Sequence, residues 1–275
     1  MIIFKDLRAE LPRNSRRVFR KRSVERIVGI VVHHTAGGDD VFATARYHIS
    51  PNHVSADGCP AINYTFHIDK SGAVSLCNDL DDKTWSIGKP PPFAIEGKQR
   101  PSSNQYFLSI VMGGSFHHRR WNKTGEHPTL NQIQALSSLL NALTSSETPP
   151  EALPFSGAPT DIAALRGYVW GALSHLTEAD LYGHFDFGKA ACPADTLENL
   201  IKAIRTNGTR YIERRTISSA RDWQQRLNDL GFNAGKVDGL WGPRSRAALI
   251  AFEQSQGLEP MGHRSDRVRK LLEEA

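Results

Sequence analysis

The longest apolar run in the chain covers residues 27–32, and two histidines follow it directly. Its length suits a buried strand and is far below the roughly 18–20 apolar residues that a membrane span needs. The mean hydropathy of −0.41 agrees with a chain that has no membrane span. We therefore expect a buried strand that carries His33 and His34 at its end.

Strand and helix signals are mixed along the segment that follows. Residues 63–76 predict a β-hairpin with a turn in its middle, and residues 106–112 predict a further strand. Apolar residues at helical spacing follow Thr129, which opens a capping box, and follow Asp195. Because strands and helices are mixed, we predict one α/β domain over residues 26–205.

A small C-terminal unit follows a polar segment. Residues 206–217 are polar and charged, which predicts a linker. Residues 218–275 hold three short helical patterns, and a unit of this size buries little core. We expect a three-helix bundle that serves as an accessory binding module.

The positive charge of the chain is concentrated at its beginning. Residues 1–26 hold nine Lys and Arg against three Asp and Glu, whereas the whole chain has a net charge of +5. Residues 1–25 are therefore expected to form a basic arm that meets a polyanion: nucleic acid, an anionic membrane surface or an anionic cell wall. The alternative is a solvated, partly disordered leader. No nucleic-acid motif accompanies the charge, so a nucleic-acid partner is not expected.

The sequence shows neither a conventional export signal nor a disulfide framework. The first residues lack the apolar core of a secretory signal, so we expect synthesis in a cytoplasm. Three cysteines are too few for a disulfide scaffold, and spacing leaves open whether Cys59 and Cys77 pair.

Two histidines and one cysteine have the residue types of a zinc site. His33 follows the predicted strand, and His184 and Cys192 lie far downstream. Two imidazoles and a thiolate give Zn²⁺ three protein ligands and leave a fourth position for water. The chain has eleven histidines, so spacing alone favours a packed histidine and a buried free thiol.

Three motifs change that balance when they are taken together. Residues 30–37 (IVVHHTAG), residues 63–66 (NYTF) and His184 with Cys192 resemble the type-2 N-acetylmuramoyl-L-alanine amidases. That superfamily includes phage amidase endolysins and the peptidoglycan recognition proteins. The resemblance covers residues 26–205 and implies a mixed central sheet flanked by helices.

The resemblance also implies a catalytic zinc ion and a set of residues around it. The metal ligands carried over by position are His33, His184 and Cys192. The family's first ligand directly follows the apolar run, which selects His33 and leaves His34 packed or supporting the site. Tyr64 matches a family tyrosine that hydrogen-bonds the developing oxyanion or the attacking water.

Several positions depart from the family pattern. The family's lysine stands two residues before the third ligand, so Lys189 is one position away from it. A glutamate on the strand at 109–113 is absent, and the frequent Trp-His pair is represented by Trp85 followed by serine. Trp85 and Asn104 are expected to help form the substrate groove, and Lys189 is a candidate catalytic residue.

The C-terminal unit has a second resemblance. Residues 218–273 look like the three-helix peptidoglycan-binding module, chiefly through the sequence DGLWGP at 238–243. Gly239 and Gly242 permit a tight loop there, and Pro243 suits the first turn of the next helix.

These resemblances predict a zinc-dependent N-acetylmuramoyl-L-alanine amidase. It would hydrolyse the lactyl amide bond between N-acetylmuramic acid and L-alanine in bacterial peptidoglycan. A phage-type endolysin that reaches the cell wall after release fits the missing export signal, and so does an effector exported by a dedicated secretion machine. The alternative is a peptidoglycan-binding or recognition protein without turnover, and the complete ligand set argues against it. A monomer is the default expectation.

Overall fold

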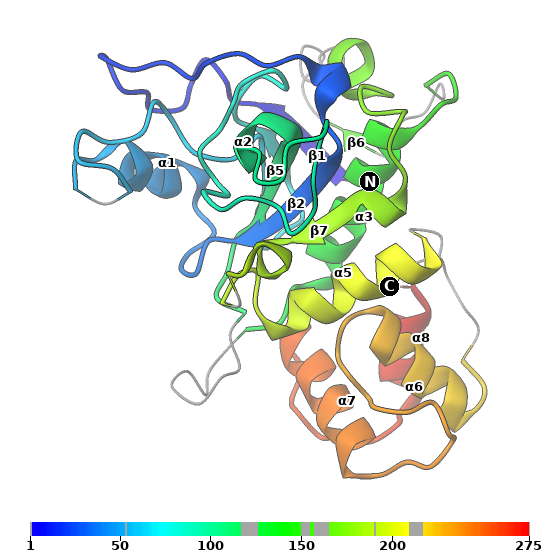
Figure 1. Cartoon of the computed structure of the whole chain (residues 1–275). Coiled ribbons are helices and arrows are strands. Elements are labelled where there is room, and N and C mark those ends of the chain that lie inside the picture. Colours follow the sequence, from blue (N-terminus) through cyan, green and yellow to red (C-terminus); the bar gives the residue numbers. More distant parts are fainter. Residues whose placement is uncertain are drawn as a thin grey trace.

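The structure is a computed structural model that describes residues 2–52, 54–116, 126–149, 155–156, 165–189, 191–208 and 217–274. A seven-stranded sheet forms its centre, with the strand order β6-β1-β4-β3-β5-β2-β7 (Figure 1). The strands are β1 (Ile2–Asp6), β2 (Gly29–His34), β3 (Phe66–Ile68), β4 (Val74–Leu76), β5 (Phe107–Met112), β6 (Phe155–Ser156) and β7 (Leu181–Gly183). The helices are α1 (Val41–Ile49), α2 (Ser103–Tyr106), α3 (Leu130–Thr144), α5 (Asp195–Asn207), α6 (Ala220–Asp229), α7 (Pro243–Ser255) and α8 (Asp266–Glu274).

Two groups of parallel strands make up the sheet. β6, β1 and β4 run in one direction, and β3, β5, β2 and β7 run in the other. The groups meet at the antiparallel pair β3–β4, which confirms the predicted hairpin. The strand predicted at 106–112 is β5. β2 begins two residues later than predicted and includes both histidines. The carboxyl ends of β5, β2 and β7 therefore lie at one edge of the sheet.

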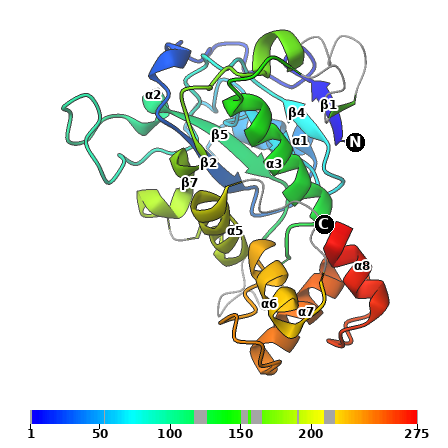
Figure 2. The same ribbon diagram turned by 90° about the vertical axis from the view of Figure 1, so that its right-hand side faces the viewer.

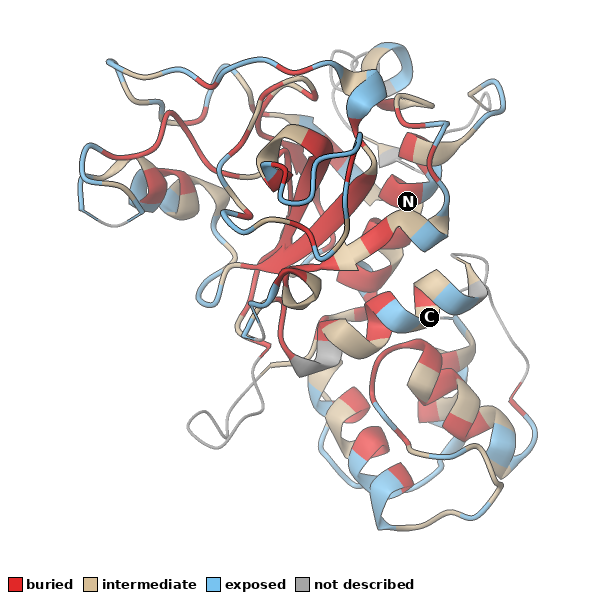
Figure 3. Ribbon diagram, in the orientation of Figure 1, coloured by how far each residue is buried: buried red, intermediate tan, exposed pale blue. Residues whose placement is uncertain are grey.

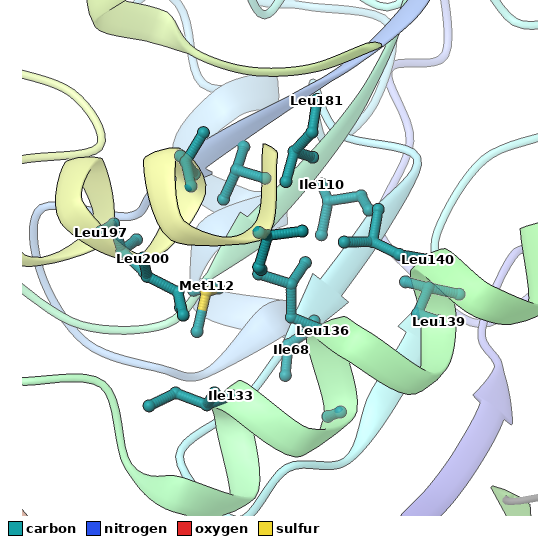
Figure 4. Packing of buried hydrophobic residues seen from close by; sticks show 14 of the residues in the cluster. Ile68, Ile110, Met112, Ile133, Leu136, Leu139, Leu140, Leu181, Leu197 and Leu200 are labelled. Atoms are coloured by element: carbon teal, nitrogen blue, oxygen red, sulfur yellow. The ribbon is translucent and has the colours of Figure 1, made fainter. Parts of the chain in front are cut away.

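The two faces of the sheet bury different residues because side chains alternate along each strand. Ile30 and Val32 of β2 point into the main core, which α3 and α5 cover (Figure 4). Val31 points to the opposite face and packs with Phe107 and Phe187. The central strands β2, β3, β4 and β5 are buried throughout, as Figure 3 shows.

The helices over the main core begin where the sequence predicts. Thr129 caps α3: its hydroxyl accepts the amide of Gln132 at 3.1 Å, and the Gln132 side chain accepts the amide of Thr129 at 3.1 Å. α5 covers the predicted helix after residue 194. The described helices are all too short or too polar to cross a membrane.

The N-terminal residues are part of the fold and not the separate basic arm expected at 1–25. β1 pairs with β4 and β6. Lys21 forms ion pairs with three aspartates at 2.8–3.0 Å: Asp79, Asp81 and Asp82. Arg22 is buried and donates hydrogen bonds to main-chain carbonyls, including that of Asn104 at 2.9 Å. These partners lie more than 50 residues away along the chain, so local charge does not reveal them.

The C-terminal unit is a bundle of α6, α7 and α8, as predicted, and it packs directly on the larger domain (Figure 2). The main core runs without a break from Ile204 of α5 to Leu227 of α6 and Phe252 of α7. The side chain of Gln134 in α3 donates to the carbonyl of Glu274 in α8 at 3.2 Å. Most of the predicted linker, residues 209–216, lies outside the described residues.

Candidate active site

Parallel pairing of β2 and β7 brings two histidines together. Val32 of β2 is in register with Gly183 of β7. The residue after each of them is a histidine, His33 on β2 and His184 at the start of a short 3₁₀ turn. Because the strands are parallel, both imidazoles lie at the same edge of the sheet, and their ring centroids are 4.7 Å apart.

The loop between β7 and α5 adds the third side chain. The amide of Cys192 donates to the carbonyl of Lys189 at 2.8 Å, which folds the loop back toward the strands. Cys192 Sγ lies 3.7 Å from Nδ1 of His33. One ligand atom each from His33, His184 and Cys192 lies within 4.8 Å of the others, so the three residues can hold a metal ion.

Strand alternation decides between the two neighbouring histidines. His33 shares the face of Val31 and meets His184 there. The ring of His34 stacks on Phe116 at 6.1 Å, and its Nδ1 accepts the Phe116 amide at 3.3 Å. The structure therefore brings His33 into the cluster and places His34 on the other face.

A hydrogen-bonded chain orients His184. Its Nε2 donates to the carbonyl of Ile87 at 2.8 Å, which leaves Nδ1 as the nitrogen available to a metal. The amide of Ile87 in turn donates to Oδ1 of Asn104 at 3.0 Å. Metal-binding histidines commonly donate their second nitrogen to a carbonyl or carboxylate in this way.

His33 and His184 are buried and Cys192 is partly exposed, and the group is electrically neutral without a metal. Burial lowers the pKa of His33 well below its usual value, and the neighbouring His184 adds to this. Burial likewise lowers the pKa of His184 and raises the pKa of the Cys192 thiol to about 12. Nε2 of His33 is buried and has no partner among the described residues.

This set of side chains fits zinc. Two imidazoles and one thiol are zinc donors, and three protein ligands are typical of a site that keeps an open position. A divalent cation would also displace the proton of the Cys192 thiol and bind the resulting thiolate.

Tyr64 lies beside the cluster. Its ring centroid is 5.2 Å from that of His33 and 5.4 Å from that of His48. Burial raises the pKa of Tyr64, and a thiolate at Cys192 would raise it further. The phenol therefore stays protonated and can donate a hydrogen bond.

A cavity of about 480 Å³ opens next to Tyr64. Residues 35–38 form one wall, and α1 forms the other through Thr44, Tyr47 and His48. The sequence analysis did not identify His48. Its Nδ1 accepts the amide of Asn63 at 3.2 Å, and burial lowers its pKa to about 4, so it is neutral with the proton on Nε2.

The remaining expected residues lie around the cluster in different ways. Lys189 is exposed. Its charge adds to the lowering of the pKa of His184 and partly offsets the burial that raises the pKa of Cys192. Trp85 is 37% exposed and packs edge-on against Phe19 at 6.1 Å. Its side chain does not line the cavity beside Tyr64 among the residues described.

Asn104, Cys59 and Cys77 all have hydrogen-bond partners inside the fold. The Asn104 side-chain oxygen is bonded to the Ile87 amide, so it supports the site from behind. Cys59 and Cys77 are both buried and free: the Cys59 sulfur accepts from Asn63 at 3.2 Å, and the Cys77 thiol donates to the carbonyl of Ser75 at 3.4 Å.

Comparison with known proteins places the chain in a family. Residues 23–195, more than half of the chain, match the N-acetylmuramoyl-L-alanine amidase family, and residues 218–263 match a putative peptidoglycan binding domain. No curated protein matches the chain in sequence.

Several solved structures resemble the chain at low sequence identity. The N-acetylmuramoyl-L-alanine amidase LysC from Clostridium intestinale URNW is 16% identical with a TM-score of 0.40, over 74% of this chain and 97% of that one. The Ph2119 endolysin from the Thermus scotoductus MAT2119 bacteriophage is 15% identical with a TM-score of 0.42, over 74% and 98%. The amidase AmiD from E. coli is 15% identical with a TM-score of 0.41, over 95% and 91%. On the family match, the chain belongs to the N-acetylmuramoyl-L-alanine amidase family and joins its amidase domain to a C-terminal domain of the peptidoglycan-binding type.

Proposed function

We propose that the protein is a zinc-dependent amidase that hydrolyses the lactyl amide bond between N-acetylmuramic acid and L-alanine in peptidoglycan. The observation that carries the proposal is the meeting of His33, His184 and Cys192 beside Tyr64 and an open cavity. Residues 26–205 would perform the hydrolysis, and residues 218–275 would hold the enzyme on the wall.

Each residue of the site has a task that follows from its position. A zinc ion, when bound, polarises the scissile carbonyl and lowers the pKa of water to roughly 7. His33, His184 and Cys192 hold that ion, and the Ile87 carbonyl fixes the orientation of His184. The Tyr64 hydroxyl donates a hydrogen bond to the carbonyl oxygen as negative charge develops there.

The enzyme would act on the bacterial cell wall after its release from the cell that makes it. An amidase domain packed on a wall-binding domain suits a phage-type endolysin, because such an enzyme must find an insoluble polymer and cleave it. Retention on the polymer raises the local substrate concentration.

Metal content and wall digestion together test the proposal. We expect close to one zinc ion per chain and release of new amino groups from purified walls. Cys192→Ala removes one ligand, so it should lose most of the zinc and the activity. Cys77→Ala is the control, because Cys77 is likewise a free cysteine but is separate from the cluster.

Two results would contradict the proposal. Wild-type protein that carries no zinc and releases nothing, yet sediments with walls, would identify a peptidoglycan-binding protein without turnover. Full activity after complete metal removal would exclude the zinc mechanism.

A further inference from the structure

The C-terminal domain carries a hollow of about 650 Å³. Trp223 of α6 and Trp241 of the loop before α7 form its apolar part, and their rings meet edge to face at 6.1 Å. Its charged part consists of Arg246 of α7, Arg264 of the loop before α8, and the pair Asp266 and Arg269 of α8. The hollow belongs to the small domain and shares no lining residue with the cavity beside Tyr64.

Gly262 shapes the loop that carries Arg264. Its φ is +65°, and a Cβ at this position would come within 2.7 Å of the Arg246 side chain. Its amide donates to the buried carboxylate of Glu253 at 2.7 Å. The loop is therefore hydrogen-bonded to α7 and packs against the aliphatic part of Arg246. Arg246 and Arg264 consequently lie on the same surface.

The arginines of the hollow differ in what they already bind. Arg269 is occupied by Asp266 at 3.3 Å and by Glu273 at 3.0 Å. Arg264 lies over the ring of Trp241 at 5.0 Å. In the described part of the chain, neither Arg264 nor Arg246 forms an ion pair. Two exposed guanidinium groups next to an aromatic ring are suited to a carboxylate, which they bind through paired hydrogen bonds.

A second hollow, of about 360 Å³, shares Trp241 and Arg246 with the first. Pro243, Ala247 and Ile250 give it a mainly apolar lining. Trp241 and Arg246 therefore stand between a cationic hollow and an apolar one. This pairing suits a ligand that alternates acidic and aliphatic groups, as a short peptide does.

We propose that this pair of hollows, which we call the Trp241 groove, binds the carboxylate-bearing stem peptide of peptidoglycan and not its glycan strand. The inference rests on the proposed function, since it names the part of the wall that the second domain holds. In intact peptidoglycan the lactyl group of each muramic acid is tied up in an amide, so the sugar chain is uncharged. The carboxylates are on the peptides, and the unpaired guanidinium groups select them.

Binding to walls by arginine variants of the full-length, zinc-loaded protein tests the groove. Arg246→Gln and Arg264→Gln each remove one unpaired cation, and we expect about tenfold weaker retention on insoluble walls. Arg267→Gln is the matched control, since Arg267 is an exposed arginine of α8 that does not line the groove. It should stay within about twofold of wild type, because it changes the net charge by the same amount as the other two variants but leaves the groove cations in place. Equal loss in all three variants would show a diffuse charge effect and overturn the proposal.

Competition identifies the ligand. Free stem peptides should displace the wild-type protein from walls, and peptide-free glycan strands or N-acetylglucosamine oligomers should not. Displacement by the glycan strands, whose lactyl carboxylates are exposed after cleavage, would overturn the assignment to the peptide.

A soluble N-acetylmuramoyl dipeptide separates this inference from the proposed function. All three arginine variants should cleave it at the wild-type rate, because the metal cluster is in the other domain. Failure of wild type to cleave it would reject the proposed function. Normal cleavage together with wild-type wall retention by Arg246→Gln and Arg264→Gln would reject the groove alone.

Discussion

Tyr64 is the side chain beside the metal ligands that has a proton to donate. Its ring packs near His33 and His48, and its raised pKa keeps the hydroxyl protonated. A donor aimed at developing charge acts on the transition state more than on substrate binding. Tyr64 should therefore affect the rate of hydrolysis and leave metal binding unchanged.

Tyr64→Phe keeps the ring and removes the hydroxyl. We expect kcat to fall roughly 100-fold, as on loss of one oxyanion donor, with zinc content unchanged. Tyr47→Phe is the control, since Tyr47 lines the same cavity but is 52% exposed. A Tyr64→Phe enzyme with wild-type kcat would remove Tyr64 from the mechanism, and loss of zinc would make it a structural residue.

His67 makes stability depend on pH at a site away from the metal ligands. Burial lowers its pKa to about 4 in the folded protein, whereas the unfolded chain has the usual value near 6.5. Below that value the unfolded state binds more protons, so the contribution is complete above about pH 6.5 and is lost as the pH falls toward 4.

Urea unfolding of wild type and His67→Gln at pH 7.5 and pH 5.0 measures this effect. We expect the free energy of unfolding of wild type to fall by about 2 kcal/mol more than that of the variant over this interval. The comparison cancels acid loss of zinc, because both proteins share the metal site. Parallel behaviour of the two proteins would show that His67 is protonated in the folded state.

Among the elements, the contact between α2 and the loop before it supports the metal site. Asn104 of α2 accepts the Ile87 amide, and the Ile87 carbonyl accepts from His184. The chain of bonds fixes the side of the His184 ring that faces Cys192. Residues acting on metal ligands in this way commonly change metal affinity.

Asn104→Leu removes the acceptor and keeps a similar volume. We expect its zinc dissociation constant, measured by competition with a chelator, to rise roughly 10–100-fold. Asn104→Asp keeps an acceptor oxygen and should stay near wild type. Ser103→Ala is the control: Ser103 bonds the carbonyl of Lys89 in the same loop, but that bond does not lead to His184. Equal loss in Ser103→Ala would mean that the loop as a whole matters and not the path through Ile87.

At the scale of the whole molecule, the two domains share one core. α5 lies between them, and Ile204 on α5 is buried in the same cluster as Leu227 and Phe252 of the small domain. The small domain is therefore held in a set position relative to the metal cluster and does not move independently of it. Removing it would expose an apolar face of α5.

A chain that ends at Gly208 tests the shared core. Each large apolar side chain that loses its cover costs roughly 1.5–3 kcal/mol, so we expect a clearly lower Tm and aggregation on heating. The full-length protein should unfold in one transition. Two independent transitions in the full chain would show that the domains are only tethered. A truncated protein with the same Tm as the full-length protein would show the same.

Much of the site was predictable because its signals are local or positional. His33 follows an apolar run, and His184 and Cys192 belong to one motif. The capping box at Thr129 predicts the start of α3. The structure brings the three predicted metal ligands together. His48 was missed because a buried histidine on a helix looks the same in sequence as an exposed one.

The sequence by itself determined the α/β class, the hairpin and the C-terminal bundle, because periodicity and caps lie within a few residues of one another. The three candidate metal ligands came from the family resemblance of their motifs, which are far apart along the chain. Only the tertiary structure decided that residues 2–6 form a strand, that Asn104 faces inward and that the small domain shares the main core. Each of these depends on partners far along the chain: β4 for the strand, Ile87 for the asparagine, and α5 for α6. Long-range pairing is selected by the shape and burial of the whole fold, which no short stretch of sequence encodes.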